Sequence, residues 1–582
     1  MSEIIVGIDL GTTNSEIAVW RDGRPVVLSD EADRAILPSV VGLAESGELL
    51  VGEAARNQAL VHPERTVRSV KRRMGKDERI RLGARDYTPQ EISAMILRRL
   101  KEIAERRLGQ PVAKAVITVP AYFSDAQRQA TREAGEIAGL EPVRILNEPT
   151  AAALTYEAGQ GEGKRIVVYD LGGGTFDVSV VRIQDGVVEV VSSHGNNHLG
   201  GDDFDAKLAG HILDHLRIRQ GVEVSGDLRA MARITRAAEE AKKRLSDAPF
   251  VRVAEEYLAE ADGKPVHLSL EIARESYEEL IEPFVAETLD AVHVALKGAG
   301  LTVAQVDEIL LVGGATRTPL IRRRLEETFG MAPRGEVDPD LCVALGAAIQ
   351  AAAIAGAAVS AVLVDATPYS FGISVLGELD GELYPYRFAP IIPKNTPIPV
   401  RRSEAFFTTH DDQEVVEINV FQGENPDAQQ NIQIGAFKVV GLGRAPAGNP
   451  IVVDLALDRD GILRVTAQEK NTGLEQRIVI DKAMPRYGEG ELAAARQRIG
   501  DLFGEPPAAV AGAAPGGAAG VPDDAEALVA RAQAKLDAAS EEDRSEMIDL
   551  IEAIRDARQA GDRERLEAAS HQLSDLIFYL ET

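Results

Sequence analysis

Apolar positions follow two different spacings along this chain. From residue 1 to about residue 358, short apolar runs such as residues 4–8 and 166–169 alternate with segments in which apolar residues recur every three or four positions. The clearest of these segments are residues 89–108, 124–139 and 228–245. Strands that alternate with helices in this way are typical of α/β proteins. We therefore predict one large α/β region up to about residue 358.

Beyond residue 365 the apolar spacing falls to two. Short alternating runs, including residues 416–420 and 462–466, are separated by Pro and Gly, which predicts an antiparallel β domain that ends near residue 481. Residues 484–503 return to helical spacing. The Ala, Gly and Pro tract at 504–522 cannot bury enough surface to order itself, so we expect a flexible tether there. Apolar residues at helical spacing in 523–582 predict a bundle of three helices.

Length, charge and composition exclude several classes of protein. A chain of 582 residues with 45% hydrophobic residues is too long for one core. Its formal charge of −28 argues against nucleic acid as a partner, because phosphate contacts need a basic footprint. The N-terminus lacks the basic and apolar regions of a signal peptide, and Cys342 is the only cysteine. Both features favour a reducing cytoplasm.

One uncharged stretch, residues 341–364, is long enough to cross a bilayer. Ala and Gly fill half of it, and neither Lys nor Arg anchors its ends. We therefore predict no membrane partner, and interpret the stretch as a buried helix at 342–355 followed by a short exposed connector at 361–365. Cys342 would be a small buried hydrophobe in that helix.

Two near-copies of one pattern carry the candidate chemistry. They are Asp9-Leu-Gly-Thr-Thr-Asn14 and Asp170-Leu-Gly-Gly-Gly-Thr-Phe-Asp177, and each follows an apolar strand. Gly and Thr allow the backbone to turn sharply and to point N–H groups and hydroxyls at an anion. A carboxylate beside phosphate requires a hard cation between them, because Mg²⁺ takes oxygen ligands from both. The pair therefore predicts a site for Mg²⁺ and a nucleoside triphosphate.

A third glycine-rich turn follows another strand, at Gly313-Gly314-Ala-Thr-Arg317. Glycine allows a flat base or sugar to approach the backbone closely. We expect the three loops to converge on one ligand and to form a cleft.

The three loops, taken in order with Ile117-Thr-Val-Pro120-Ala-Tyr-Phe and Asn147-Glu148-Pro-Thr-Ala, resemble the seventy-kilodalton heat-shock chaperones of the DnaK type. The resemblance continues through Leu199-Gly-Gly-Asp-Asp-Phe-Asp205 and Phe421-Gln-Gly-Glu-Asn to the helical end. Within that family the chain is most similar to the short HscC branch, through Ala18-Val-Trp20, the compact segment after Lys71-Arg-Arg-Met-Gly75, Val343-Ala-Leu-Gly-Ala-Ala-Ile-Gln350 and an abbreviated lid.

The resemblance implies an α/β, actin-like, two-lobed ATPase domain, an antiparallel β-sandwich that binds peptides, and a short α-helical lid. The implied boundaries are residues 1–358 for the ATPase domain, 359–365 for the linker, 366–484 for the β-sandwich and 485–582 for the lid, which the tether at 504–522 interrupts. The implied cofactors are ATP or ADP and Mg²⁺, with K⁺ as a further candidate cation. ATP hydrolysis would act as a conformational switch.

The family's site residues carry over to matching positions here. Those that would hold Mg²⁺ are Asp9 and Asp170, and those that would act in hydrolysis are Lys71, Glu148, Asp170 and Thr175. The phosphates would contact Gly11, Thr12, Thr13, Asn14, Gly172, Gly173, Gly174, Gly200 and Gly201. The nucleoside would rest against Glu239, Lys242, Lys243 and Ser246, which share one helix face, and against Gly313, Gly314, Arg317 and Asp340.

Two further sets follow from the resemblance. The relay between nucleotide state and connector would use Pro120, Arg128, Val362, Leu363 and Asp365. The channel for an extended peptide would be lined by Ile373, Val375, Leu376, Phe406, Thr409, Val416 and Ile418. Within it, residues two apart on a strand face the same side. We interpret Phe407 and Phe421 as plain sheet core.

The chain departs from the family pattern at three places. Thr409 stands where a small apolar residue is usual, the loop from Gly377 to Phe388 is longer and more acidic, and the tether replaces much of the lid helix. A flexible tether does not hold two bodies in register, so we predict fast peptide release even with ADP bound.

The partners that the resemblance implies are unfolded or extended client polypeptides and a J-domain co-chaperone. Dependence on a nucleotide exchange factor stays open. Two alternatives share the ATPase scaffold: a small-molecule kinase, which would leave residues 366–582 without a role, and an actin-like filament protein, whose stacking the appended domains would obstruct.

Overall fold

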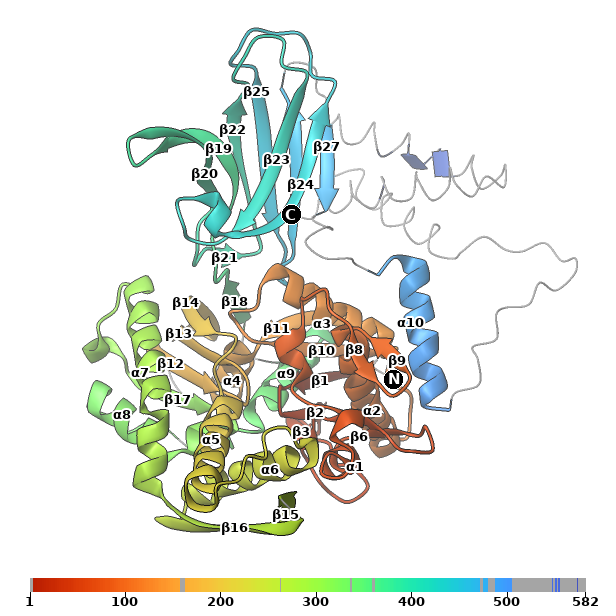
Figure 1. Ribbon diagram of the computed structural model, residues 1–582. Helices are drawn as coiled ribbons and strands as arrows, with labels where there is room; N and C mark the ends of the chain where they lie inside the picture. The colour runs from red at the N-terminus through yellow and green to blue at the C-terminus, as the bar shows by residue number, and fades with distance from the viewer. Residues whose placement is uncertain are drawn as a thin grey trace, which may run out of the picture. The chain divides into compact units, whose positions relative to one another are not determined.

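The computed structural model describes residues 4–504, apart from 158–162, 262, 335–337, 358, 360–361, 471–474 and 480–486. Beyond residue 504 it describes six single residues, which are Met547, Leu550, Ile551, Ala553, Ile554 and Leu573. The chain divides into two compact units, residues 1–508 and 509–582. The elements described below all lie in the first unit (Figure 1).

The first of two six-stranded sheets has the strand order β11-β10-β1-β2-β3, and β4 pairs with β2. Strand β1 runs parallel to β10 and antiparallel to β2, so β1 and β2 form a hairpin. The strands are β1 (Ile5–Leu10), β2 (Asn14–Arg21), β3 (Arg24–Val27), β4 (Leu37–Pro38), β10 (Lys114–Val119) and β11 (Glu141–Asn147).

The second sheet, of order β17-β12-β13-β14-β18-β21, repeats this arrangement. Strand β12 is antiparallel to β13 and parallel to β17, as β1 is to β2 and β10. The two near-copies of the phosphate pattern therefore occupy equivalent hairpin turns. The strands are β12 (Lys164–Leu171), β13 (Phe176–Gln184), β14 (Val187–Asn196), β17 (Glu308–Val312), β18 (Val362–Ala366) and β21 (Pro397–Ile398).

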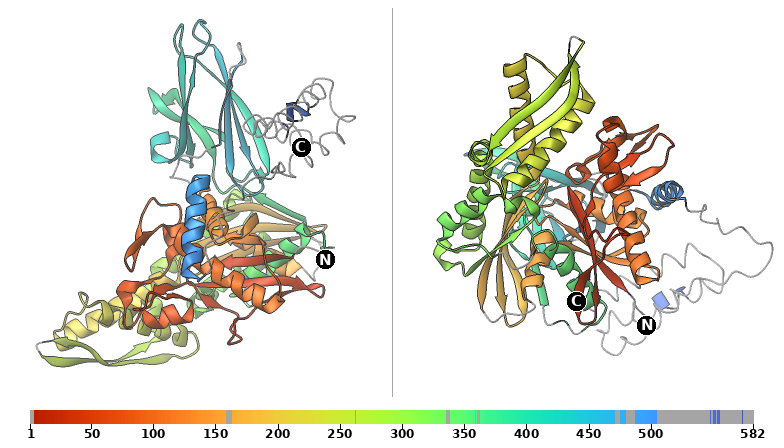
Figure 2. Two further views of the ribbon diagram at one scale, coloured as in Figure 1. Left: turned by 90° about the vertical axis from the view of Figure 1, so that its right-hand side faces the viewer. Right: turned by 90° about the horizontal axis from the view of Figure 1, so that it is seen from below.

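Each sheet has its own apolar core on its outer side, and a third core joins the two sheets. We call the part built on the first sheet the first lobe, and the part built on the second sheet the second lobe (Figure 2). Helices α2 and α3 pack in the first lobe, α5 to α8 in the second, and α4 against α9 between them. The helices are α1 (Glu53–Gln58), α2 (Pro89–Leu108), α3 (Asp125–Ile137), α4 (Glu148–Glu157), α5 (Gly201–Gln220), α6 (Leu228–Leu245), α7 (Arg274–Gly298), α8 (Pro319–Phe329) and α9 (Cys342–Ile354).

The helices predicted from apolar spacing are present. Residues 89–108 and 228–245 are α2 and α6, and Ser124 caps α3 through a reciprocal capping box with Gln127. The Ala-rich stretch is α9, and its Cys342 is fully buried. Among the residues described, none of the helices is both long and apolar enough to span a bilayer.

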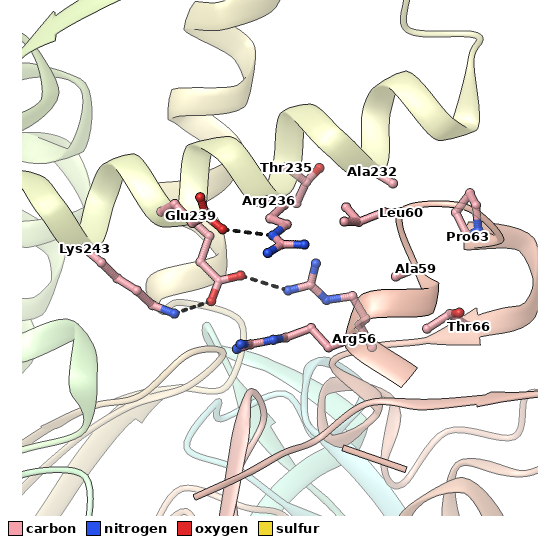
Figure 3. A pocket seen from close by; sticks show the side chains of 12 residues that line it. Arg56, Ala59, Leu60, Pro63, Thr66, Ala232, Thr235, Arg236, Glu239 and Lys243 are labelled. Carbon is pink, nitrogen blue, oxygen red and sulfur yellow. Dashed lines mark hydrogen bonds and ion pairs between the residues drawn. The ribbon is translucent and has the colours of Figure 1, made fainter. Parts of the chain in front are cut away.

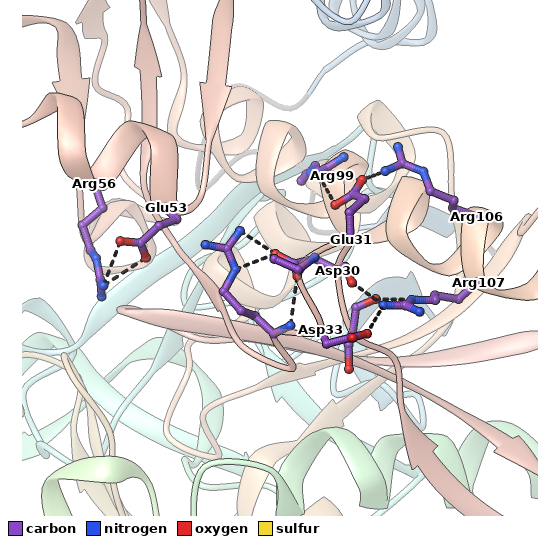
Figure 4. A network of polar contacts seen from close by, with 11 residues as sticks. Asp30, Glu31, Asp33, Glu53, Arg56, Arg99, Arg106 and Arg107 are labelled. Atoms are coloured by element: carbon purple, nitrogen blue, oxygen red, sulfur yellow. Dashed lines mark hydrogen bonds and ion pairs between the residues drawn. The ribbon is translucent and has the colours of Figure 1, made fainter.

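Arginines on α2 tie its C-terminal half to the loop that follows β3. Arg99 donates to Glu31 at 2.8 Å, and Arg107 donates to Asp33 at 2.7 Å (Figure 4). Exposed ion pairs of this kind contribute at most about 1 kcal/mol each. Their effect is therefore to fix the loop on the helix.

The β domain is a sandwich of two four-stranded sheets, of orders β20-β19-β23-β24 and β22-β25-β26-β27. Alternate residues of both sheets fill one core, as the spacing of two predicts. The strands are β19 (Phe371–Leu379), β20 (Glu382–Ile392), β22 (Val400–Phe407), β23 (Val415–Gln422), β24 (Ile432–Val440), β25 (Pro450–Leu457), β26 (Leu463–Glu469) and β27 (Glu475–Val479).

Two details differ from the sequence prediction. The supposed loop from Gly377 to Phe388 is an extended β19–β20 hairpin whose tip, Asp380-Gly381, has positive φ at both residues. Asp-Gly is the usual sequence of such a turn, so the signal was present. Phe421 is buried as expected, but Phe407 is 63% exposed, because it ends its strand at the rim of the sheet.

The helix expected at 484–503 is α10 (Glu489–Leu502), which packs on α2 and α3 of the first lobe. Its Ala495 and Ile499 are buried in the first-lobe core, and Arg498 donates to the buried Glu91 at 2.5 Å. Most of the predicted tether and bundle lies outside the described residues. Of the predicted bundle positions, Ile551, Ile554 and Leu573 are described, and each is helical and buried.

Candidate nucleotide-binding site

A cavity between the lobes is lined by both phosphate motifs, and we call it the floor. The β1–β2 turn contributes Gly11 to Asn14, and the β12–β13 turn contributes Gly172, Gly173 and Thr175. The second turn closes with a hydrogen bond from Gly172 N to Thr175 O at 3.1 Å. The structure thus brings together most of the predicted phosphate residues.

Lys71 is the only cation that lines the floor among the residues described. A 3₁₀ turn, Val70–Arg73, holds it 3% exposed, and its Nζ donates to Glu148 Oε1 at 2.5 Å. Burial opposes its charge, but Glu148 and then Asp9 raise the pKa of Lys71 above its ordinary value. Its ammonium therefore stays charged.

Buried acids outnumber that single cation. Burial, followed by repulsion from Glu148, raises the pKa of Asp9 to about 7. The same two causes raise the pKa of Asp170. Burial and then the charge of Asp9 raise the pKa of Glu16. A cluster of this kind is more stable with bound protons or a bound cation than with all of its carboxylates ionised and unpaired.

The chemistry of these acids fits Mg²⁺. Asp170 Oδ2 is buried without a hydrogen-bond partner in the described structure, so one hard oxygen is available for a cation. Asp9 Oδ1 accepts from Thr118 at 3.1 Å, which orients that carboxylate. The described residues hold no cluster of three or more His, Cys, Asp or Glu side chains with metal-ligand geometry. Asp9 and Asp170 would thus share a cation with water and phosphate oxygens.

The third glycine turn meets the floor as predicted. Gly313, Gly314 and Asp340 line the same cavity. Gly313 has φ +80°, and a Cβ there would lie 2.4 Å from Leu171 O, so only glycine fits. Arg317 lies half-exposed and is held by Asp340 at 2.8 Å and by Asp338 at 2.6 Å.

Gly174, Gly200 and Gly201 lie beside the floor without lining it. Gly201 N donates to Gly172 O at 3.0 Å, so the start of α5 is fastened to the second phosphate turn. Lys242 points to the same place, donating to Gly201 O and, at 2.8 Å, to Asp205.

Glu239 and Lys243 line a second cavity, which we call the mouth (Figure 3). It has a volume of about 220 Å³ and lies between α6 of the second lobe and residues 56–68 of the first. Lys243 Nζ donates to Glu239 Oε1 at 2.6 Å. Ser246 is the C-cap of α6 and lines neither cavity. Of the four helix residues predicted to contact the nucleoside, Glu239 and Lys243 thus line the mouth, Lys242 contacts residues beside the floor, and Ser246 lines neither cavity.

Several residues near the site were missed. Glu16 lines the floor from β2, and Asp177 is buried just behind it, accepting from Tyr122 N at 3.3 Å. Asp177 is the last residue of the second phosphate motif, so the sequence contained a signal for it. Asp202 accepts from Thr13 at 3.2 Å and from Ser69 at 2.6 Å, which links the two lobes. Contacts of this kind between distant segments leave no local pattern.

Three of the predicted relay residues, Val362, Leu363 and Asp365, form the connector strand β18. Strand β18 pairs with β14, and Asp365 is buried and accepts from Thr150 at 3.1 Å. The prediction of an exposed connector is thus only partly right: Val362 is 61% exposed, but the strand pairs with the second sheet. Arg128 is 5% exposed and donates to Asn147 Oδ1 at 2.7 Å.

Pro120 is buried at the end of β10, directly before Ala121, whose carbonyl accepts from Arg128 at 2.9 Å. The β domain adds contacts of its own to this side of the first lobe. Asp460 forms ion pairs with Arg132 and Arg144 and accepts from Ile145 N at 3.1 Å. The connector therefore pairs with the second sheet, while one turn of the β domain contacts the first lobe.

Two of the predicted channel residues lie inside the core of the sandwich. Ile373 and Ile418 are only 2% and 3% exposed and lie in the sandwich core, with Val375, Phe406 and Val416 packed at its edge. Apolar residues at every second position identify the apolar face of a strand. They do not show whether that face lines a channel or packs against a second sheet. Leu376 is 49% exposed, and Thr409 belongs to an exposed turn, in which its N–H donates to Gln413. These two residues are therefore more exposed than the other five predicted channel residues.

The comparisons with known proteins agree with this architecture. The family model for Hsp70 protein matches residues 5–579. The protein named Chaperone protein DnaK in Thermotoga neapolitana is 49% identical over 486 residues, which cover 82% of this chain and 80% of that protein. Its namesake in Thermotoga maritima gives the same values, and that of Thermosipho africanus is 47% identical over 485 residues, with the same coverage. The finer resemblance to the HscC branch stays a prediction. The chain belongs to the Hsp70 family.

Proposed function

We propose that this protein is an ATP-dependent molecular chaperone that binds and releases extended hydrophobic segments of unfolded polypeptides. One observation carries the proposal: two phosphate turns, one cation and an excess of buried acid meet on the floor between two lobes. Membership of the Hsp70 family supports the same function and does not favour the kinase or filament alternatives.

The floor residues divide the work of phosphate-bond cleavage. Asp9 and Asp170 would hold Mg²⁺, and the bound Mg²⁺ would supply positive charge to the triphosphate of ATP. Lys71 offsets negative charge that develops on the transferred phosphoryl group. The Glu148 carboxylate can accept a hydrogen bond from the attacking water, and Thr175 can orient that water from the opposite turn. N–H groups of the glycine turns hold the remaining oxygens.

The connector transmits the nucleotide state. A ligand changes a two-state equilibrium only through unequal affinity for the two states. We infer that nucleotide-dependent closure of the lobes favours the pairing of β18 with β14, because Asp365 at the end of β18 is bonded to Thr150 of α4, two residues after Glu148. Arg128 is electrostatically coupled to Asp365 and acts from the first lobe.

The β domain would take the client. In the conformation described, with the connector paired, Ile373 and Ile418 lie inside the sandwich. We infer that a peptide gains access to them only when this packing loosens, so that docking of the connector and retention of peptide oppose each other. The finer assignments belong to this proposal too: an actin-like ATPase domain at 1–358, a linker at 359–365, a β-sandwich at 366–484 and a lid at 485–582.

The partners and conditions of this proposal follow from the same function. Client polypeptides and a J-domain co-chaperone are expected, with a cytoplasmic location and with ATP or ADP, Mg²⁺ and K⁺ as candidate ligands. The compact segment after Gly75 forms a short hairpin, and Thr88, which follows it, lies 2.7 Å from Tyr487, two residues before α10, measured between their hydroxyl oxygens.

The test measures nucleotide and peptide together. Titration calorimetry with Mg²⁺ and ATP should show binding by the full chain, and release of a fluorescent apolar peptide should accelerate when ATP is added. Thr175→Ala should bind ATP but hydrolyse it slowly, and its peptide release should still respond to ATP. Absence of ATP binding, or peptide release that ignores ATP, would contradict the proposal.

A further inference from the structure

Four side chains meet where the β domain touches the two lobes, and we call this cluster the junction. They are Tyr122 of the first lobe, His194 of β14 in the second lobe, and Tyr369 and Lys394 of the β domain. The Tyr122 ring lies edge-on to His194 at 5.2 Å and against Tyr369 at 4.5 Å, measured between ring centroids. Lys394 Nζ lies 5.7 Å from the centre of the Tyr122 ring, and the Tyr369 hydroxyl donates to Tyr122 O at 2.8 Å. One aromatic ring thus joins both lobes to the β domain.

The imidazole of His194 is held in its neutral form at the junction. Its Nδ1 is buried and has no hydrogen-bond partner among the described residues. Burial, followed by the positive charge of Lys394, lowers the pKa of His194 from an ordinary 6.5 to about 4. A proton on this ring is therefore costly while the β domain is in place.

The acidic groups around the junction do not pair with the imidazole. Asp177 of β13 accepts from Tyr122 N at 3.3 Å, and burial raises its pKa, which favours the uncharged carboxyl. Glu287 of α7 accepts from a side-chain amide at the end of β14 at 2.6 Å. Glu424 of the β domain acts on Lys394, whose own pKa is lowered by burial. Lys394 is thus the charge that a protonated imidazole would meet.

Two further buried polar atoms beside His194 lack partners in the described structure. Ser192 lies two positions earlier on β14, facing the same side, and its Oγ is one of them. The other is Oδ1 of Asn395, which follows Lys394 and has a left-handed φ of 62°. Both side chains approach the end of α7, where a Cβ on Gly298 would lie 2.4 Å from Ser192 Oγ and 3.0 Å from Asn395 Nδ2. Each unpartnered atom reduces the gain from docking, so the cost of one proton can decide whether the β domain stays docked.

We propose that the junction is a pH-sensitive switch: a proton on His194 releases the β domain from the two lobes, so that acidification moves the protein toward the state that retains peptide. This inference rests on the proposed function, in which docking of the connector and retention of peptide oppose each other. Tyr369 follows β18 (Val362–Ala366) closely in the chain, so the junction forms together with the paired connector. The switch acts without a change of nucleotide.

The direction of the effect follows from proton linkage. Well above pH 6.5, His194 is neutral whether or not the β domain is docked, so pH has no effect on docking through this group. Between pH 6.5 and about pH 4, the undocked imidazole binds a proton that the docked one does not, so docking weakens as pH falls. If undocking restores the ordinary pKa, the ratio of docked to undocked protein should fall about tenfold between pH 7.5 and pH 5.5.

The experiment measures docking in the full chain by energy transfer between dyes on two introduced cysteines. Ser225→Cys in the second lobe and Lys438→Cys in the β domain are both exposed, whereas the native Cys342 is buried. A Thr175→Ala background with saturating Mg²⁺ and ATP keeps the nucleotide state constant. From pH 7.5 to pH 5.5, energy transfer should fall reversibly and release of a fluorescent apolar peptide should slow. In His194→Gln, whose side chain stays neutral, most of both responses should disappear.

The controls separate the switch from other effects of acid. His198→Gln removes an exposed histidine from the same segment and should keep the full response. Lys394→Met removes the repelling charge without altering β14, so it should reduce the response, and it decides the test if His194→Gln does not dock at pH 7.5. An undiminished response in both variants would overturn the inference, because the acids of the floor would then account for it. Absence of any ATP-dependent docking at pH 7.5 in the otherwise unaltered chain would instead overturn the proposed function, and the inference with it.

Discussion

The floor and the mouth of the cleft treat buried carboxylates in opposite ways. On the floor, burial and the charge of Glu148 raise the pKa of Asp9 to about 7. At the mouth, burial would also raise the pKa of Glu239, but Lys243 and then Arg68 lower it to about 2. The floor is short of positive charge, whereas the mouth is neutralised by the protein itself.

The difference indicates two separate tasks. The excess negative charge of the floor is neutralised only when a cation binds there with its phosphate. We therefore infer that the floor residues govern ligand binding and hydrolysis. A region whose charges are already paired gains little from a ligand's charge. Its contact between Arg68 and Glu239 joins the two lobes, so it can form or break as the lobes move.

Removal of the floor's cation should have the largest effect. Lys71→Ala leaves the developing phosphoryl charge without its ammonium, and we expect the single-turnover rate of ATP hydrolysis to fall by at least about 100-fold. Lys101→Ala removes a lysine from α2, outside the cleft, and should keep the wild-type rate. Near-normal hydrolysis in Lys71→Ala, with an unchanged circular dichroism spectrum, would remove the distinction between floor and mouth.

The next effect concerns the cation itself. Asp170→Asn replaces the carboxylate whose Oδ2 has no partner among the described residues. We expect the Mg²⁺ concentration needed for half-maximal ADP binding to rise by roughly 10- to 100-fold. Asp177→Asn alters a buried acid that does not line the cavity, and it should raise this Mg²⁺ concentration less. An equal shift in both variants would mean that the floor acts through net charge and not through Asp170.

A third prediction uses pH. Below about pH 4, Asp9 is protonated in both folded and unfolded protein. Between about pH 4 and pH 7 the unfolded chain ionises and the folded group does not, so unfolding releases a proton and becomes easier as pH rises. Asp9→Asn removes this penalty while its amide oxygen can still accept from Thr118. The variant without nucleotide should have a higher thermal midpoint than wild type at pH 8, and the gain should vanish near pH 4. A midpoint below that of wild type at pH 8 would contradict this.

The sequence predicts the floor better than any other region, because its signals are local. Asp9 and Asp170 end strands, their glycines follow at once, and the repeated hairpin places the two turns face to face. Lys71 and Glu148 could be placed only through the family resemblance. Glu16 was missed because its role depends on antiparallel pairing, in which it lies directly opposite Asp9.

The mouth and the β domain were less predictable for a related reason. Arg68 and Glu239 are far apart in the chain, and neither carries a pattern that names the other. Ile373 and Ile418 have the correct alternation, but the pattern cannot tell whether a second sheet covers them. The paired connector shows the same limit, since an apolar strand indicates pairing but not its partner. Contacts between distant segments decide all three.

The smallest predicted effect mirrors that of Asp9. The folded pKa of Glu239, about 2, lies below its unfolded value of 4.5, so its stabilisation is present above pH 4.5 and is lost as pH falls toward 2. Glu239→Gln should therefore lower the thermal midpoint by the same few degrees at pH 8 and at pH 6, consistent with about 1 kcal/mol for a partly shielded pair. The deficit should shrink below about pH 4.5. Calorimetry of Asp9→Asn and Glu239→Gln side by side makes the comparison sharp: at pH 8 one variant should gain stability and the other should lose it. If both shifted in the same direction, the floor and the mouth would not differ in charge balance.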